Sequence, residues 1–466
     1  MLNLYFGGDS MDFLYVILTV LLCAAAVTMI LKKMDTRLTF LFLGVIGLAA
    51  ATIVTGQSVL GDSGTGSLVL DIFDVIRAKF VSTIQGTGIR LMMIGGYVML
   101  MNHTKAADVL AIGASKLLKP IKNPYVVLAL VYMIGAVLKI FITSQIALGL
   151  LFMATMFPIL RRLGVSKVAA AATCVAIGGM DLGPNDSTGI FAASDILGGT
   201  PMDWFVNYEI VIGPVIIVCV GIFIAFWNSY MDKKEFGGLV IPEEAKEDVK
   251  IADLGVPAFY GVFPLIPLTL VVVFSFVDGV KMDVITAHII CFFLFFIVDL
   301  IVKKDMARLN DNLKKTWIWM GNYFNNIIVL ISVASVFAEA IKKLKGIDVL
   351  CGVLSNIGGA AIIVAIAMAA IQIGTALLTG SSNAPWYAFG TMGADMAATL
   401  GVHNGLLLVP MHLSGGLCRC FSPFCGAMIA VSGMVEEEPM VLCKRNMVPM
   451  LFGVVVCFIA TFVMFG

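Results

Sequence analysis

Charged side chains are scarce in this 466-residue sequence. Asp, Glu, Lys and Arg together make up 13% of the residues, whereas soluble domains carry about 25%. Apolar residues make up 60%, and the mean hydropathy is +1.01. This shortage of charge excludes an ordinary soluble domain and predicts a polytopic membrane protein.

Sequence features of several other protein classes are also missing. No basic patch with interleaved aromatic residues indicates a nucleic-acid partner. No nucleotide-binding loop, zinc motif or nucleophile elbow is present, which argues against a primary pump and against an intramembrane enzyme. Cys418 and Cys420 are too close for the usual zinc spacings, so the ten cysteines are interpreted as buried free thiols, and no cofactor is expected. Residues 1–10 lack the basic flank of a signal peptide.

The main feature of the sequence is a series of long apolar runs. A run of about 20 residues crosses roughly 30 Å of hydrocarbon as a helix. Runs of this kind occur near 13–31, 38–55, 86–104, 210–229, 257–279, 284–302, 316–341 and 447–465. Two regions between them, 124–201 and 358–435, are interrupted by polar residues and do not read as simple spans.

The first interrupted region begins with a predicted re-entrant hairpin at 123–160. Basic residues lie on both sides of it: Lys105, Lys116, Lys119 and Lys122 before it, and Arg161, Arg162 and Lys167 after it. If lysine and arginine mark the cytoplasmic side, both flanks face the cytoplasm. The second arm, 146–160, reaches only about 22 Å as a helix, which is short of a full crossing. Two ordinary spans joined by a tight outer turn are the alternative.

A broken helix follows at 168–201. It is interrupted by Asp181–Thr188, which contains Gly183 and Pro184, and these two residue types loosen the backbone and remove a helix hydrogen bond. The same pair of elements is predicted in the second half. A hairpin at 358–400 has its tip at Thr379-Gly380-Ser381-Ser382-Asn383-Ala384-Pro385, and a broken helix at 404–435 is interrupted near Arg419–Phe424.

These elements repeat in the same order along the chain. Residues 11–229 and 257–466 each contain three spans, a hairpin, a broken helix and a final span, joined by a polar cytoplasmic linker at 230–256. Five crossings per series is an odd number, so the second copy is inverted. The N-terminus is predicted outside, although Lys342, Lys343 and Lys345 disagree with this orientation. The predicted fold is an all-α membrane protein of two inverted-topology repeats, an architecture of secondary transporters with the site between the repeats.

The two tips and two breaks supply polar groups at membrane depth, and in each repeat one tip is expected to approach one break. Backbone carbonyls and the oxygens of Ser144, Asn185, Ser381 and Asn383 would suit a sodium ion. Hydroxyls, amides and half-helix N-termini would suit a carboxylate. Non-helical backbone is tolerated in a membrane only where it is buried in protein or lines a cavity.

Four ionisable residues stand out within these apolar stretches. The planar fork of Arg419 matches a carboxylate, although the same side chain could instead satisfy carbonyls of a broken helix. Asp181 and Asp186 could carry protons or complete a cation site, or one of them could only cap a half-helix. His412 could titrate near neutral pH.

At these residues the chain resembles the anaerobic C4-dicarboxylate carriers of the Dcu-C type, within the ion transporter superfamily. The resemblance runs from about Asp12 to the end, and its most specific parts are residues 379–389, 150–158, 230–235 and 419–433, continuing to Lys444-Arg445. It implies a carrier for succinate, fumarate or malate in the bacterial cytoplasmic (inner) membrane, working by symport, exchange or efflux. The superfamily's divalent-anion symporters are homodimers that move a transport domain past a scaffold.

The resemblance assigns Ser381, Ser382 and Asn383 to the second tip, and Arg419, Ser422 and Pro423 to the second break. Together with the reading of the residues themselves, it gives two candidate sets. The substrate-binding candidates are Thr143, Ser144, Gln145, Pro184, Asn185, Thr379, Ser381, Ser382, Asn383, Pro385, Arg419, Ser422 and Pro423. The candidates for coupling Na⁺ or H⁺ are Ser144, Asp181, Asn185, Asp186, Ser187, Ser381, Asn383 and His412.

Other functions remain open. The same fold could carry another small anion, an amino acid or a peptide, because the first tip and the acidic first break depart from the family's pattern. An anion channel is the alternative from a different class, and it would give unsaturable, uncoupled flux. An embedded enzyme has the least support, because Asp181 and Asp186 lack an accompanying motif.

Overall fold

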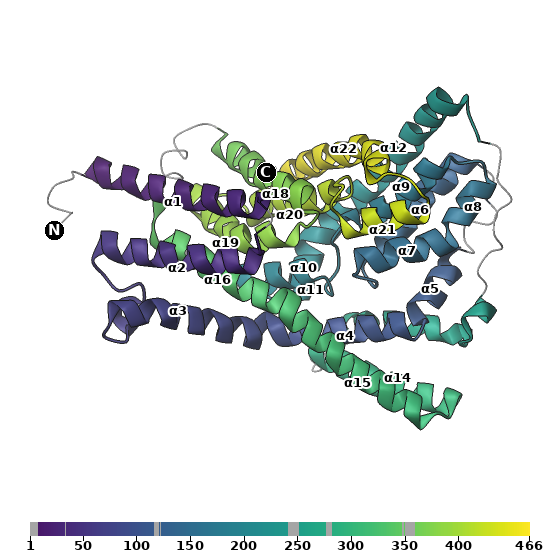
Figure 1. Cartoon of the computed structure of the whole chain (residues 1–466), viewed down its shortest axis with the longest axis horizontal. Coiled ribbons are helices and arrows are strands. Elements are labelled where there is room, and N and C mark those ends of the chain that lie inside the picture. Colours follow the sequence, from purple (N-terminus) through teal and green to yellow (C-terminus); the bar gives the residue numbers. More distant parts are fainter. Residues whose placement is uncertain are drawn as a thin grey trace.

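The computed structural model describes residues 8–466 except 33, 116–120, 122, 241–250, 276–281, 347–348 and 350–358. Within these residues every regular element is helical, as the sequence predicts (Figure 1). Four parts of the predictions fall outside the described residues: Lys116, Lys119 and Lys122, residues 241–250 of the linker, the end of the predicted span 257–279 from residue 276, and residue 358 at the start of the second hairpin.

The chain opens with two apolar helices and one much longer helical stretch. The long stretch runs from Leu68 to His103 and contains one wide π-helical turn, Ile84–Gly88. Asp35 caps the second helix by accepting hydrogen bonds from the backbone N–H groups of Arg37 and Leu38. The elements are α1 (Gly8–Leu31), α2 (Thr36–Thr55), η2 (Gly61–Ser63), α3 (Leu68–Thr83), η3 (Ile84–Gly88), α4 (Ile89–His103) and α5 (Ala106–Ser115).

The long stretch corrects the predicted span at 86–104. The helix begins 18 residues earlier, at Leu68, in a segment whose charges had hidden it: Asp71, Asp74, Arg77 and Lys79. Residues 86–104 form only its second part, and they are not among the described helices that are long and apolar enough to cross a membrane. Apolar runs alone therefore misjudge a helix whose charged turns face water or neighbouring polar groups.

The predicted first hairpin and first broken helix coincide with helices that end at the polar residues. Asn123 caps α6, with Pro124 at the first helical position, and Ser144 caps α7 by accepting from the N–H of Ala147 at 3.3 Å. The break contains Gly183 at φ +111°, a conformation that favours glycine. The elements are α6 (Pro124–Leu138), α7 (Gln145–Thr155), α8 (Phe157–Arg162), α9 (Lys167–Ala176), η5 (Ile177–Gly179), α10 (Ser187–Phe191) and η6 (Ala192–Ile196).

A long helix then leads to the linker, and a second series of helices follows. The predicted span at 257–279 differs from the structure: its first part is a 3₁₀ stretch, because Pro257 and Pro264 remove backbone donors there. The elements are α11 (Pro201–Trp204), η7 (Phe205–Glu209), α12 (Ile210–Phe236), η8 (Ile251–Leu254), η9 (Ala258–Leu265), α13 (Ile266–Ser275), α14 (Val284–Lys303), α15 (Met306–Tyr323), η10 (Phe324–Ile328) and α16 (Val329–Lys343).

The third helix of each series has the same irregularity. A π-helical turn interrupts the stretch from α3 to α4, and another, η10, interrupts the stretch from α15 to α16. The two stretches pack closely, since a Cβ added at Gly95 of α4 would lie 2.4 Å from the Tyr323 ring.

The last part of the chain contains the second predicted hairpin and broken helix. A hairpin of α18 (Ala360–Thr379) and α19 (Asn383–Leu400) turns at Gly380, which has φ +74°. The broken helix consists of α20 (Asn404–Arg419) and α21 (Gly426–Met434), and α22 (Pro439–Phe465) ends the chain.

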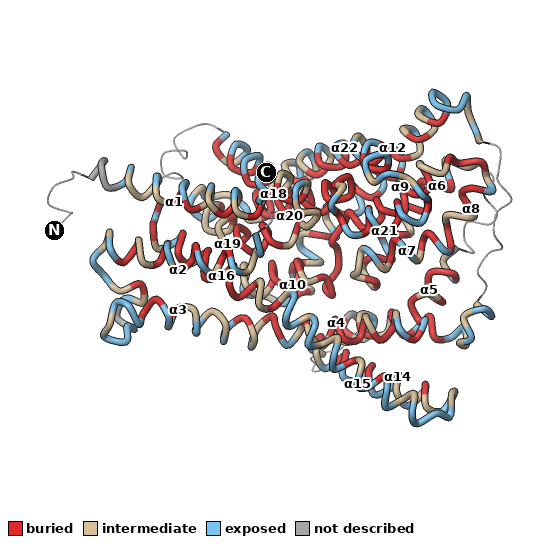
Figure 2. The backbone as a smooth tube through the Cα atoms, in the orientation of Figure 1, coloured by how far each residue is buried: buried red, intermediate tan, exposed pale blue. Residues whose placement is uncertain are grey.

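Seven of the described helices are long and apolar enough to cross a membrane. They lie at 12–30, 36–55, 201–236, 284–303, 306–343, 360–379 and 439–465. The most buried backbone lies where α7, α9, α10, α20 and α21 meet, while one end of the α14–α15 pair projects from the body (Figure 2). Every residue of α20 from Gly405 to Arg419 is buried.

Asp232, at the end of α12, forms a buried polar anchor that joins four helices. It accepts hydrogen bonds from the Ser166 hydroxyl at 2.7 Å and the Tyr125 hydroxyl at 3.1 Å, and it pairs with Arg445 of α22 at 3.2 Å. Arg445 also pairs with Glu235 at 2.5 Å. Because Asp232 and Arg445 are almost fully buried, neither charge can be left alone without a large penalty.

We expect Arg445→Met to destabilise the fold strongly. The substitution leaves Asp232 buried without its cation, which costs about 3–5 kcal/mol. The measurement is the melting temperature in detergent. Arg77→Met is the matched control, because the Arg77–Asp74 pair is largely exposed and its loss should not change the melting temperature. Equal melting temperatures for Arg445→Met and the wild type would contradict the anchor.

Candidate functional site

The two tips and the two breaks meet around one cavity of about 300 Å³. Its wall combines hydroxyl, amide and charged groups with two residues of the η10 region, Tyr323 and Ile327. The other lining residues are Thr143, Ser144, Gln145, Ile146, Asp181, Asn185, Asp186, Ser187, Gly380, Asn383, Arg419, Cys425, Gly426 and Ala427.

Four buried charges lie together beside this cavity. Lys139, directly after α6, pairs with Asp181 at 3.0 Å and with Asp186 at 3.1 Å. Arg419 pairs with Asp181 at 2.6 Å. All four side chains are at least nine-tenths buried, so each ion depends on its partners for stabilisation. Two cations and two carboxylates therefore balance each other.

The Arg419 guanidinium is held by groups from three elements. One nitrogen, Nη2, donates to the carbonyl of Gly178 at 2.8 Å and to Asp181 Oδ1 at 2.6 Å. Nη1 donates to the Ser382 hydroxyl at 3.1 Å, while Nε is buried and has no hydrogen-bond partner. Arg419 thus does bind a carbonyl of a broken helix, the alternative raised from the sequence, but its Nε donor is left unused.

Asp186 caps a half-helix, and it also belongs to a longer polar chain. Its Oδ1 accepts from the backbone N–H of Thr188 at 3.0 Å, which caps α10. The Thr188 hydroxyl donates to the same oxygen at 2.6 Å and lies 2.7 Å from Nε2 of His412. Because that hydroxyl has donated its only proton, it accepts from a protonated Nε2 of His412. His412 is connected to the charge cluster in this way, but it does not line the cavity.

The first tip contacts the second break. Gln145 donates from Nε2 to the Cys420 thiol at 3.3 Å, and its Oε1 accepts from the Cys425 thiol at 3.6 Å. Gln145 also packs against its own repeat, since a Cβ at Gly178 would lie 2.1 Å from it. The tips therefore approach breaks of both repeats, whereas the sequence led us to expect that in each repeat one tip approaches one break.

The second tip is fixed by hydrogen bonds to its own helices and by close packing. Ser422 donates to the carbonyl of Leu377 at 2.6 Å, and Gln372 donates to the carbonyl of Ser382 at 2.6 Å. A Cβ at Gly380 would lie 2.4 Å from the backbone of Phe424, so only glycine fits this turn. The second hairpin and the second break are thus joined by a hydrogen bond and by close packing at Gly380.

Not every predicted residue reaches the cavity. Seven of the thirteen substrate candidates do not line it: Pro184, Thr379, Ser381, Ser382, Pro385, Ser422 and Pro423. Ser382 and Ser422 support the wall through the contacts above, and Thr379 and Ser381 bond to each other within the tip. The roles of all these candidates in binding stay predictions.

Sequence reasoning missed several residues at the site. Lys139 is the most important, and its signal was present: a lysine directly after the apolar run 124–138 and four residues before the tip. Tyr323 and Ile327 gave no signal, because they lie in a span far away in the chain. Glu209 is buried beside the first break, where it accepts from the N–H of Gly183 at 2.6 Å and from Trp204 at 2.8 Å.

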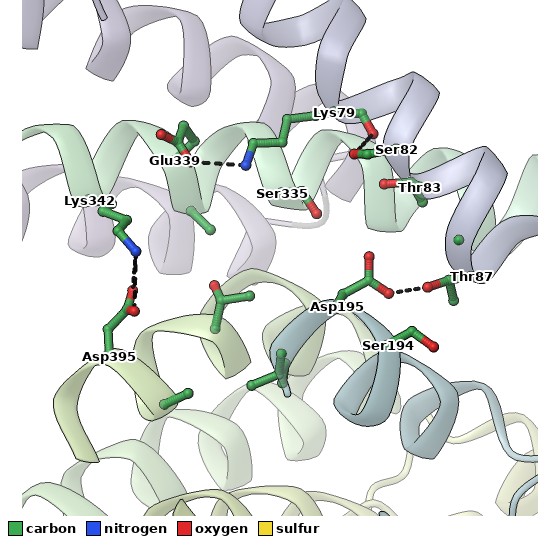
Figure 3. A pocket seen from close by; sticks show the side chains of 15 residues that line it. Lys79, Ser82, Thr83, Thr87, Ser194, Asp195, Ser335, Glu339, Lys342 and Asp395 are labelled. Carbon is green, nitrogen blue, oxygen red and sulfur yellow. Dashed lines mark hydrogen bonds and ion pairs between the residues drawn. The ribbon is translucent and has the colours of Figure 1, made fainter. Parts of the chain in front are cut away.

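A larger polar cavity, of about 440 Å³, lies away from the tips (Figure 3). Lys342 of α16 pairs across it with Asp395 of α19 at 3.2 Å, and Thr87 of η3 donates to Asp195 of η6. Lys79 and Glu339 pair at 2.9 Å on one side of it. This cavity contains none of the predicted site residues, so the smaller one is the candidate site.

Comparison with known proteins agrees with this architecture. The family model described as "C4-dicarboxylate anaerobic carrier" (DcuC) matches residues 11–466. The probable anaerobic C4-dicarboxylate transporter DcuC of Vibrio cholerae is 30% identical over 91% of both chains. The anaerobic C4-dicarboxylate transporter DcuC of Escherichia coli K12 is 30% identical over 90% of both.

Among solved structures, the YdaH transporter of Alcanivorax borkumensis, described as having an unusual topology, shares the fold. Its TM-score is 0.60 at 13% identity, over 92% of this chain and 97% of that one. The match of the family model across nearly the whole sequence decides the family. This multi-pass membrane protein belongs to the DcuC family of anaerobic C4-dicarboxylate carriers.

Proposed function

We propose that this chain is a secondary transporter that moves succinate, fumarate or malate across the bacterial cytoplasmic membrane by symport, antiport or efflux. The family and the names of its relatives support the solute class. The observation that carries the proposal is the cavity between the tips and breaks, where Arg419 meets hydroxyl and amide groups. Its volume of about 300 Å³ suits a small solute.

An amino acid or other zwitterion is the second candidate, and one observation favours it. Asp181 and Asp186 line the same cavity as Arg419, so carboxylates are available for an ammonium group. A dicarboxylate would place its two carboxylates beside Asp181 and Asp186, and these like charges would repel each other. Competition between labelled succinate and unlabelled amino acids would separate the two candidates.

The balance of buried charges supports coupling to a cation. In the described part of the site, Lys139 and Arg419 are already matched by Asp181 and Asp186. A dianion would therefore add two negative charges that these residues do not compensate, at a high cost in a low dielectric. We propose that Na⁺ or H⁺ enters with it. Ser144, Asn185 and Asn383 line the cavity and supply hydroxyl and amide oxygens of the kind that bind sodium, and Ser381 supplies another hydroxyl in the second tip.

The larger polar cavity supports an elevator-type movement of the hairpins and broken helices past the remaining helices. Two of its contacts join α16 and η3 on one side to α19 and η6 on the other (Figure 3). Breaking polar contacts that border a cavity costs less free energy than breaking packed apolar contacts, because water can take the place of the lost partner. By analogy with the superfamily, we propose a homodimer.

Purified protein in proteoliposomes should take up labelled succinate with saturable kinetics. Preloading with unlabelled fumarate, or an inward Na⁺ or H⁺ gradient, should accelerate uptake, because a carrier is coupled and a channel is not. Liposomes without protein are the control. Unsaturable flux that ignores both treatments would contradict a carrier.

Arg419→Lys should raise the KM for succinate about tenfold to a hundredfold. Lysine keeps the charge, but it lacks the planar fork that can bind a carboxylate through two parallel hydrogen bonds, and a charged hydrogen bond contributes about 1.5–3 kcal/mol. Arg77→Lys, at an exposed pair, is the matched control. An unchanged KM in folded Arg419→Lys would exclude a role for the planar fork.

The inverted repeats predict opposite sides for equivalent loops. Gln57, between α2 and α3, and Lys304, between α14 and α15, are both exposed and occupy the same place in each series. On a background checked for native thiols, Gln57→Cys should react with an impermeant maleimide from outside, and Lys304→Cys only from the cytoplasm. Labelling of both from one face would overturn the inverted arrangement.

A further inference from the structure

Asp181 occupies the part of Arg419 that best holds a carboxylate. Nε and Nη2 form one edge of a guanidinium, and such an edge can bind both oxygens of a carboxylate through two parallel hydrogen bonds. Asp181 uses only half of it. Its Oδ1 accepts from Nη2 at 2.6 Å, whereas the neighbouring Nε is buried and has no partner.

An unpartnered donor of this kind is costly, because it has lost water and gained nothing in return. Arg419 is 8% exposed and is one of the residues that line the cavity where a solute would lie. The Asp181–Arg419 contact is therefore strong in charge but incomplete in geometry. A free carboxylate that reached the same edge could satisfy both nitrogens.

Asp181 also has a second cation to which it can remain bound. Its Oδ1 accepts from Lys139 at 3.0 Å, so loss of the Arg419 contact would not leave it as an isolated buried charge. Lys139 in turn holds Asp186 at 3.1 Å. The cluster can release Arg419 and stay paired.

We propose that Asp181 is an internal stand-in for a substrate carboxylate. It holds Arg419 while the site contains no solute, and a carboxylate of the solute displaces it, leaving it with Lys139. This proposal rests on the proposed function, in that the solute is a carboxylate. It makes Asp181 a residue that competes with substrate rather than one that binds it.

The net charge of the empty site bears on whether the empty carrier can cross the membrane. With Asp181 on Arg419, the two cations and two carboxylates cancel, so the empty site carries no net charge from these four groups. An empty carrier of this kind can return across the membrane, which net transport requires. Without Asp181, a buried positive charge would oppose that return, while exchange of one substrate for another would be less affected.

The test compares the affinity for succinate of two variants by calorimetry in detergent. Asp181→Asn should bind succinate at least about tenfold more tightly than the wild type, because Arg419 loses its ionic competitor. Asp186→Asn is the matched control: it removes the same charge from Lys139 but does not touch Arg419, so its gain should be several-fold smaller. If both variants gained the same affinity for succinate, the change in net charge alone would explain the effect, and the proposal that Asp181 is a stand-in would be wrong. Weaker binding by folded Asp181→Asn would also overturn it.

A double variant guards against misfolding and tests the charge balance. Asp181→Asn with Lys139→Gln removes one charge of each sign, and Asp186 keeps its two hydrogen bonds from Thr188, so the double variant should fold even if the single variant does not. It should still bind more tightly than the wild type. In proteoliposomes, Asp181→Asn should lower the ratio of net uptake to exchange at least tenfold, and the double variant should raise that ratio again. A double variant that binds like the wild type would count against the stand-in.

Two further results distinguish a failure of this proposal from a failure of the proposed function. If the wild type binds no succinate but Asp181→Asn does, the stand-in is supported. If no folded variant binds any dicarboxylate, the proposed function fails, and the stand-in fails with it. The wild type alone supplies a last check: efflux from loaded liposomes into substrate-free buffer should occur, and obligatory exchange would overturn the neutral empty carrier.

Discussion

The structure depends on the pairing of charges that have been taken out of water. Lys139, Asp181, Asp186 and Arg419 come from three separate places in the chain, and each depends on its partners for stabilisation. The cluster therefore fixes the relative positions of the first hairpin, the first break and the second break. The hydrogen bond from Arg419 to Ser382 extends this constraint to the second tip. The two tips and the two breaks are thereby held together around one site.

Interrupted helices add a second requirement, because each break frees backbone groups that must be satisfied within the protein. The chain meets it in part with side chains that look like binding residues in the sequence. Asp186 caps α10, Ser144 caps α7, and Ser422 and Gln372 bind carbonyls of the second hairpin. The same polar groups that could hold a solute are thus partly committed to holding the backbone, and two of these capping residues, Ser144 and Asp186, also line the cavity.

The sequence predicts the helical order and the interruptions well, because glycine, proline and small polar residues are local signals. Gly183 and Gly380 have the positive φ values that only such residues adopt readily. The sequence does not predict which tip meets which break, since the contact of Gln145 with Cys420 and Cys425 joins residues some 275 positions apart. Lys139 was overlooked because it follows an apolar run, and Leu68–Thr83 because its charges interrupt the apolar pattern.

The long third helix of the second series, residues 306–343, has a consequence for the surrounding lipid. Its 38 residues would extend about 57 Å as a continuous helix, nearly twice the roughly 30 Å of hydrocarbon. Such a helix must tilt steeply or project into the headgroups, and the stretch from Leu68 to His103 faces the same choice. The free energy of these long helices in the membrane therefore depends on the thickness of the bilayer. Tyr323 and Ile327, which line the cavity, lie near the middle of the stretch 306–343, so a change in the tilt of this helix would alter the shape of the site.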